Sequence, residues 1–275
     1  MVVCVVSGIN ESRIRNVDMI YILDLILLLE LRGVKTKREE ICSTMMRSKI
    51  IHLVRHGQAT HNVRAEPARA AGCSFEDFIQ LMREDDQIDS QLTDAGLKQA
   101  EDVKKTATEL TPQLIVVSPL SRAIDTGFIV FGTTLPYVCR ESLRERNGLL
   151  LNGKRQPLAY LQEKYLNIDF ENIPPGEDDA WNGYGANELE TPEACSQRAY
   201  ESLLWVVARE ETEVAVVAHG GLFHQMTNGL PELIKCDKVA SERFHNCELR
   251  TLRLRWEEST SDDDTKMVLY LEAVV

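Results

Sequence analysis

From residue 49 onward, short continuous apolar runs alternate with segments that have the periodicity of helices. Strands that are apolar throughout are typical of a parallel sheet whose two faces are covered by helices. The sequence therefore predicts a three-layer α/β/α sandwich with a mostly parallel central sheet. The expected strands cover residues 49–55, 112–119, 135–139 and 213–219, followed by a closing pair at 248–256 and 266–274.

Segments with an apolar residue every three or four positions are expected to form the helices of this sandwich. Ser74 is a possible cap for the first helix, Thr93 or Asp94 caps the second, and Pro192 suits the first turn of a later one. Residues 147–190 are rich in glycine, proline, asparagine and acids, which indicates a long irregular insert around one helix. The expected helices cover residues 74–84, 92–110, 120–131, 157–166, 191–210 and 221–230, and an acidic turn covers 257–265.

Residues 1–47 are interpreted as an N-terminal extension of uncertain structure, and residues 48–275 as the main domain. The segment Met19–Leu31 is strongly apolar, but an aspartate interrupts it, and about 18 clean apolar residues are needed for a membrane span. It also lacks the basic start and the cleavage site of a signal peptide. We expect an extra helix on the domain or a non-native extension, with Met45 or Met46 as alternative starts. A reversible contact with a membrane surface stays open, but stable membrane insertion is not expected.

The charge and the cysteines narrow the range of partners and compartments. Lys and Arg number 31 against 43 Asp and Glu, so the net charge is −12. Because nucleic-acid binding needs a positive face, no such partner is expected, whereas a local pocket can still bind a small phosphorylated compound. The seven cysteines are odd in number and scattered, without a C-x-x-C pair. This pattern indicates reduced thiols in a cytoplasmic protein rather than a disulfide framework or a zinc site. The oligomeric state is left open.

Polar and charged residues follow three of the predicted strands at the point where each strand ends. Ligands of such sheets bind at the carboxyl ends of the strands. Two histidines and two arginines at three strand ends would make a site for an anion with several oxygen atoms. The residues are Arg55, His56 and Gly57 after the first strand, Ser118 and Arg122 after the second, and His219, Gly220 and Gly221 after the fourth.

These residue types suit phosphoryl transfer. Arginines can hold the equatorial oxygens of a phosphoryl group, and a neutral histidine nitrogen can accept that group as a phosphohistidine. Such an intermediate splits one hard displacement into two easier ones. Gly57 would let the backbone approach the anion closely, and a helix that starts near Gly220 could add backbone N–H donors.

Four segments, in a fixed order along the chain, carry a family resemblance. They are LVRHGQATHN, SQLTDAGLKQA, VVSPLSRAIDT and VVAHGG, within residues 49 to 230. Together they resemble the motifs of the histidine phosphatase superfamily, also called phosphoglycerate mutase-like proteins. The resemblance implies an α/β sandwich fold and catalysis without a metal or cofactor. It further implies His56 as the nucleophile, with Arg55, Arg122 and His219 forming the phosphate pocket and Asn62 as the pocket asparagine.

The segment after the third strand matches the region in which the family places its proton donor. The resemblance implies Glu145 in this role, with Glu141 as the rival. A longer match, from Arg144 into an acidic-acidic-x-Trp segment, is similar to mutase-like proteins of plants, fungi and protists. In that comparison Lys154 and Arg155 match a basic pair and would contact a second anionic group of the substrate, although a solvated loop is an equally open interpretation.

The sequence favours a phosphatase that acts on a small phosphorylated substrate. Gln58 stands where glycolytic mutases have an acidic residue, and no tyrosine follows Glu145. A phosphoglycerate-type mutase and a non-catalytic phosphate-binding regulator remain the alternatives. Of the other histidines, His52 is expected to pack against its surroundings, and His61 either lines the mouth of the pocket or packs. His224 would suggest a metal only with a third converging ligand, so no metal is expected.

Overall fold

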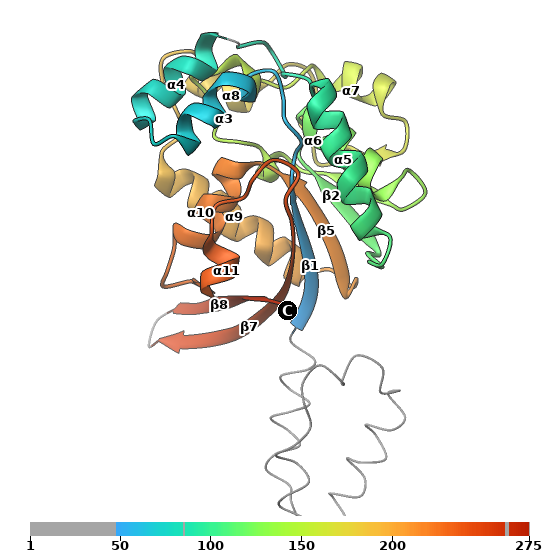
Figure 1. Cartoon of the computed structure of the whole chain (residues 1–275). Helices are drawn as coiled ribbons and strands as arrows, with labels where there is room; N and C mark the ends of the chain where they lie inside the picture. The colour runs from blue at the N-terminus through green and yellow to red at the C-terminus, as the bar shows by residue number, and fades with distance from the viewer. Residues whose placement is uncertain (1–47, 85, 262–263, 275) are drawn as a thin grey trace, which may run out of the picture. The chain divides into compact units, whose positions relative to one another are not determined.

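The computed structural model describes residues 48–84, 86–261 and 264–274 (Figure 1). They form a single eight-stranded sheet with helices on both sides. No helix in these ranges combines the length and the apolar character needed to cross a membrane. The extension at 1–47, including its apolar segment, lies outside the described residues, so its interpretation stays a prediction.

The strand order in the sheet is β4-β3-β2-β5-β1-β7-β8-β6. The neighbours β1–β7 and β7–β8 are antiparallel, and the other five neighbouring pairs are parallel. The prediction of a mostly parallel sheet is thereby confirmed. The strands are β1 (Ser48–Arg55), β2 (Leu114–Val117), β3 (Tyr137–Cys139), β4 (Ile168–Asp169), β5 (Glu213–Ala218), β6 (Ile234–Cys236), β7 (Leu249–Ser261) and β8 (Asp264–Ala273).

Helices cover the sheet on its two faces, as the three-layer prediction requires. The core on one face is formed with α9, α10 and α11, whereas α6 and α7 pack on the other face and α5 lies beside α6 (Figure 1). The helices are α3 (Asn62–Ala70), α4 (Phe75–Glu84), α5 (Asp94–Ala107), α6 (Ser121–Phe131), α7 (Leu158–Lys164), α8 (Asp179–Tyr184), α9 (Pro192–Val207), α10 (Gly220–Asn228) and α11 (Lys238–Ser241).

Strand β1 shows how the apolar pattern builds both layers. Ile51 and Leu53 are fully buried in the core that includes α9, and Val54 is fully buried in the core that includes α6. His52 is also buried, with Nδ1 2.9 Å from Thr251 Oγ1 and Nε2 3.0 Å from an oxygen of Glu213. The expectation that His52 packs against its surroundings is therefore confirmed.

The helix caps follow the residues expected for them. Ser74 Oγ accepts a hydrogen bond from the Asp77 N–H at the start of α4. Thr93, and not Asp94, caps α5, because its Oγ1 accepts from the Gly96 N–H at 3.1 Å. These side chains bind amide groups that have no partner within the first helical turn.

Two local expectations differ from the structure. Helix α3 is absent from the prediction because Pro67 lies inside it, and proline disfavours a helix interior. Burial of Ala65 and an ion pair from Glu66 to Arg55 stabilise this helix through tertiary contacts instead. The acidic segment 257–265 is mostly paired strand, since β7 runs to residue 261 and β8 begins at 264.

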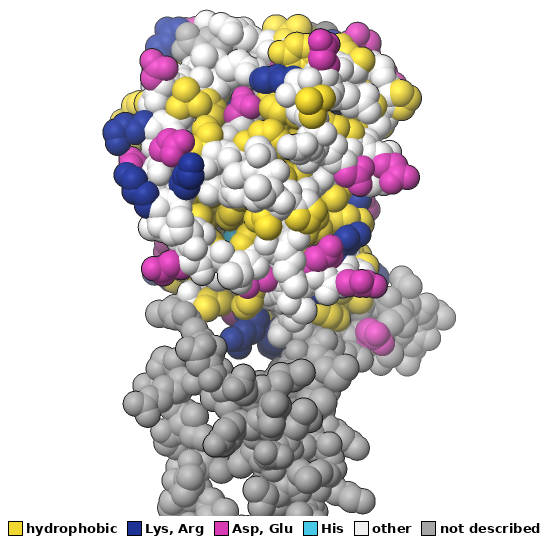
Figure 2. All heavy atoms as spheres, turned by 90° about the vertical axis from the view of Figure 1, so that its right-hand side faces the viewer, with side chains coloured by type: hydrophobic (Ala, Val, Ile, Leu, Met, Phe, Trp, Pro, Cys, Tyr) yellow, Lys and Arg dark blue, Asp and Glu magenta, His cyan; other side chains and the backbone are white. Residues whose placement is uncertain are grey.

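The charges of the protein are mixed on the face that carries α5 and α7. Figure 2 shows acidic and basic side chains interspersed there, and the described residues on this face form no broad patch of one sign.

Candidate active site

The register of the three central strands brings their carboxyl ends together. Arg55 at the end of β1 pairs with Ala218 at the end of β5, and the His56 N–H donates to the Ala218 carbonyl at 3.0 Å. Strand β2 ends level with β5, because Val117 pairs with Val217. The residues that follow these strands therefore meet at one edge, as predicted from the order of strands and helices.

His56 is held in one tautomer by its own neighbour. Its Nδ1 lies 2.6 Å from the Gly57 carbonyl oxygen, which can only accept, so Nδ1 carries the proton. Nε2 is therefore unprotonated, and its lone pair accepts a hydrogen bond from the Nε–H of Arg122 at 3.3 Å. The side chain is almost fully buried but lines the pocket. Nε2 is the nitrogen that is placed to act as a nucleophile.

Arg122 and His219 complete a floor around His56. Arg122 is completely buried, with Nη1 donating to the Asn152 carbonyl at 2.7 Å and Nη2 without a partner. The His219 ring centroid lies 5.0 Å from that of His56. His219 Nε2 lies 2.7 Å from Ser118 Oγ, and its Nδ1 has no partner. Unpaired buried nitrogens are costly, and Arg122 and His219 each keep one beside His56, although neither residue is among those that line the pocket.

The electrostatics of the floor keep its histidines neutral and its arginine charged. Burial first, and then the charges of Arg122 and Arg55, lower the pKa of His56 well below its usual value. The same causes lower the pKa of His61, and burial followed by Arg122 and His56 lowers that of His219. Burial lowers the pKa of Arg122 only to about 10, so this guanidinium stays cationic at neutral pH. Neutral imidazoles beside a cation suit the binding and attack of a phosphoryl group.

Arg55 contributes a second cation at the edge of the floor. Its Nη2 donates to Glu66 at 2.5 Å and its Nη1 to the Phe244 carbonyl at 2.9 Å, while the buried Nε has no partner. Gly220, the first residue of α10, lies against this guanidinium. A Cβ at Gly220 would lie 2.9 Å from Arg55 Nε, so the glycine leaves the space that Arg55 occupies.

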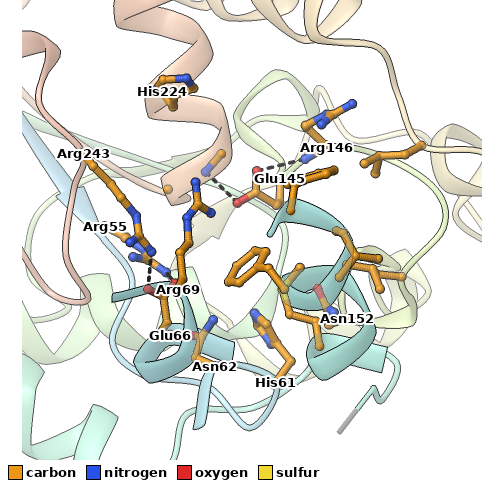
Figure 3. A pocket seen from close by; sticks show the side chains of 18 of the residues that line it. Arg55, His61, Asn62, Glu66, Arg69, Glu145, Arg146, Asn152, His224 and Arg243 are labelled. Carbon is orange, nitrogen blue, oxygen red and sulfur yellow. Dashed lines mark hydrogen bonds and ion pairs between the residues drawn. The ribbon is translucent and has the colours of Figure 1, made fainter. Parts of the chain in front are cut away.

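Glu145 enters the same pocket from the segment after β3 (Figure 3). One carboxylate oxygen accepts from the Gly221 N–H at 2.9 Å, and the other from the Arg146 N–H at 3.1 Å. A Cβ at Gly221 would lie 2.2 Å from this carboxylate. The rival Glu141 does not line the pocket, because Arg144 and Arg155 bind its two oxygens at 3.0 and 2.7 Å.

Asn62 and His61 also line the pocket, but Gly57 does not. Asn62 Oδ1 accepts from the Ala59 N–H at 3.0 Å, and the His61 ring centroid lies 6.1 Å from that of His56. A Cβ at Gly57 would lie 2.6 Å from a backbone oxygen of the α5 residue Gly96. The structure thus accounts for Gly57 by close packing against a helix, instead of the expected approach to an anion.

The structure does not bring Lys154 and Arg155 to the pocket lining. Arg155 is buried within the insert, where its Nε donates to Glu141 at 2.7 Å and its two Nη atoms donate to backbone carbonyls. The Lys154 ammonium lies 4.9 Å from the centre of the Trp181 ring. We therefore correct the expectation for Arg155, whose donors are all used to hold the insert together.

Several pocket residues were absent from the sequence prediction. Arg69, Arg243 and His224 lie on one side of the pocket (Figure 3), and apolar residues of α4 lie on another. Helix α3 would have indicated Arg69, whereas nothing in the local pattern around Arg243 indicates a pocket. The pocket has a volume of about 230 Å³. Among the described residues, no three His, Cys, Asp or Glu side chains converge as they would around a metal ion.

The family follows from comparison with known sequences. A sequence model of the histidine phosphatase superfamily (branch 1) matches residues 51–262, and the chain belongs to this superfamily. It is 29% identical over 241 residues to phosphoglycerate mutase-like protein 1 of Arabidopsis thaliana, which covers 75% of this chain and 81% of that protein. It is also 29% identical over 223 residues to glucosyl-3-phosphoglycerate phosphatase of Mycobacterium tuberculosis, which covers 77% of this chain and 88% of that protein.

Solved structures agree on the fold. A structure described as mycobacterial hydrolase 2 aligns with a TM-score of 0.50 and 23% sequence identity, over 84% of this chain and 93% of that one. At this identity the likeness shows a shared fold alone. Together with the family match, it confirms the predicted superfamily and fold class.

Proposed function

We propose that the protein is a phosphatase that hydrolyses a small phosphorylated substrate through a phosphohistidine on His56. The observation that carries this proposal is the unprotonated His56 Nε2, which accepts a hydrogen bond from cationic Arg122 at 3.3 Å and shares its pocket with Glu145. Membership of a superfamily that includes the relative named glucosyl-3-phosphoglycerate phosphatase supports hydrolysis at a general level.

The first step forms the phosphoenzyme. His56 Nε2 attacks the phosphorus with its lone pair, and the bond from phosphorus to the substrate oxygen breaks. Arg55, Arg122 and His219 hold the other phosphoryl oxygens, where their unpaired nitrogens offer donors aimed at the developing charge. The Glu145 carboxyl gives its proton to the leaving oxygen, so the product departs as an alcohol.

The second step releases phosphate. The Glu145 carboxylate takes a proton from a water molecule as its oxygen attacks the phosphorus, and the bond from phosphorus to Nε2 breaks. The electron pair returns to Nε2, so His56 is neutral again, with Nδ1 still donating to the Gly57 carbonyl. Glu145 ends protonated and ready for the next substrate.

A pair of substrates with different leaving groups tests both roles. p-Nitrophenolate leaves without needing a proton, so Glu145→Gln should form the phosphoenzyme from p-nitrophenyl phosphate and then stall. We expect a burst of one p-nitrophenolate per protein molecule. The protein should then carry the added mass of one phosphoryl group, and acid should remove this group. An alkyl phosphate should show no burst. His56→Ala should give neither burst nor turnover.

Matched variants control for structural damage. His245→Ala and Glu188→Gln change exposed residues outside the pocket lining and should turn over like wild type. Turnover by His56→Ala equal to wild type would overturn the phosphohistidine proposal. Transfer of the phosphoryl group between positions of a phosphoglycerate, without release of phosphate, would favour the mutase. Phosphate binding without any turnover would favour the regulatory binder.

A further inference from the structure

One wall of the pocket contains arginines in addition to those that would bind the phosphate. Arg243, from the segment before β7, extends to Glu66, and Arg69 of α3 lies beside it (Figure 3). We call Arg69 and Arg243 the arginine wall. Its two residues come from distant parts of the sequence, and neither belongs to a motif that carried the family resemblance.

A single carboxylate neutralises this group of three guanidinium ions. One oxygen of Glu66 accepts from Arg55 at 2.5 Å, and the other accepts from Arg243. Although burial alone would raise it, the pKa of Glu66 is lowered by these two arginines, so Glu66 is an anion. Two of the three positive charges therefore remain uncompensated by Glu66.

Arg69 is the least neutralised member of the group. Its guanidinium carbon lies 4.6 Å from the centre of the Phe78 ring, and no described carboxylate forms an ion pair with it. Burial, followed by the charge of Arg243, lowers the pKa of Arg69, whereas the charges of Glu66 and Glu145 act in the opposite direction. A planar guanidinium stacked on a ring keeps its edge donors free for an oxyanion.

Apolar side chains lie beside these cations. Phe75, Phe78, Ile79 and Met82 of α4 line the pocket together with Leu150 of the insert. Phe75 has 59% of its surface exposed, which is unusual for so large an apolar side chain and leaves it available to a ligand. A ligand that fills the pocket would thus meet an apolar surface as well as charge.

We propose that the arginine wall binds a carboxylate of the substrate while the floor around His56 holds its phosphate. This proposal rests on the proposed function, which places the phosphate on the floor around His56. The substrate class is then a phosphomonoester with an apolar or ring-containing body against α4 and a carboxylate against Arg69 and Arg243. This assigns to the arginine wall the contact that the sequence suggested for Lys154 and Arg155.

Binding of non-hydrolysable phosphonates tests the proposal without requiring turnover. The ligands are benzylphosphonate and its 3- and 4-carboxy derivatives, with the corresponding carboxamides as neutral controls of the same shape. Calorimetry on wild type should show one carboxylate binding about tenfold more tightly than its carboxamide, as one charge-assisted contact would give. Methylphosphonate, which lacks the ring, should bind more weakly than benzylphosphonate.

The arginine variants should remove the preference for the carboxylate. In Arg69→Gln the affinity ratio of carboxylate to carboxamide should fall close to one. In Arg243→Gln this affinity ratio should fall further, because Glu66 loses one of its arginine partners and repels the carboxylate of the ligand. Arg64→Gln is the matched control: it lies on the same helix, is paired with Glu84 at 2.6 Å, and does not line the pocket. This control should keep the wild-type ratio.

The outcomes separate this proposal from the proposed function. Equal affinity of wild type for carboxylate and carboxamide, or an unchanged ratio in Arg69→Gln, would overturn the arginine wall as a carboxylate site and leave the hydrolase intact. A preserved ratio in a protein that hydrolyses no phosphomonoester would support the site and overturn the hydrolase. Failure of every phosphonate to bind would overturn both.

Discussion

Buried arginines occur in two regions of this molecule and are used in opposite ways. On the floor of the pocket, Arg55 and Arg122 each keep one buried nitrogen without a partner. In the insert, Arg155 is equally buried, but it donates to Glu141 and to four backbone carbonyls. Arg55 and Arg122 thus keep a free donor, whereas every donor of Arg155, at a similar depth, is paired.

The two regions differ in whether the folded chain supplies acceptors for the hydrogen-bond donors of the buried arginines. A buried donor without a partner costs free energy, so a protein that keeps several of them in one place loses stability there. Such a cost is expected where a ligand supplies the missing acceptors. Arg122 and Arg155 therefore make a matched pair: the first should matter for activity and the second for stability.

The largest effect is expected from Arg155→Gln. The change removes one of the two arginine partners of Glu141 and leaves buried carbonyls without donors, so we expect the free energy of unfolding to fall by about 3 to 5 kcal/mol. Urea denaturation measures this loss. Lys154→Gln, one residue away and only partly buried, is the control and should change stability little. A stable Arg155→Gln protein with weak substrate binding would instead restore the substrate role suggested by the sequence.

Arg122→Gln should show the opposite balance. Loss of a donor aimed at the phosphoryl oxygens should lower kcat/KM by about 10² to 10³, or about 3 to 4 kcal/mol in the transition state. Burial already lowers the pKa of this arginine to about 10, so removal of the charge should not lower the free energy of unfolding. Steady-state kinetics and urea denaturation of one sample check both. A stability loss as large as that of Arg155→Gln would erase the distinction between the two regions.

Most of the sheet could be predicted because its central strands are apolar along their whole length. β1, β2 and β5 lie where the continuous runs placed them, since burial on both faces leaves this direct mark on a sequence. β4 has two residues and β6 three, which is too short for any period to show. Helix α3 escaped prediction because its stability comes from tertiary contacts that outweigh the cost of Pro67.

The residues of the floor could be predicted for a similar reason. Parallel strands present their carboxyl ends at one edge, so the sequence alone was enough to expect Arg55, His56 and His219 to meet. The roles given to them and to Glu145 remain predictions. The arginines of the wall could not be predicted, because Arg69 lies on a helix that the sequence did not indicate and Arg243 lies in an irregular segment before β7. Arg243 reaches the pocket only through a long-range ion pair with Glu66.

The smallest effect expected for a single residue is the loss of stability at low pH caused by each histidine of the floor. The folded protein holds the pKa values of His56, His61 and His219 well below that of an unfolded chain, which is about 6.5. Below that pH the unfolded state binds more protons than the folded state, so stability is complete above it and is lost as the pH falls. Each histidine should lower the free energy of unfolding by about 1 kcal/mol at pH 6. At lower pH, the loss per histidine should approach about 1.4 kcal/mol per pH unit.

Urea denaturation between pH 8 and pH 5.5 measures this slope, and His219→Gln isolates one histidine from other titrating groups. The variant should lose stability less steeply than wild type as the pH falls. His245→Gln, which changes an exposed histidine, should follow the wild-type curve. Identical slopes for wild type and His219→Gln would mean that His219 is already protonated in the folded protein. The floor would then hold a charged group that the fold compensates, as the insert does for Arg155. The contrast between the two regions would no longer hold.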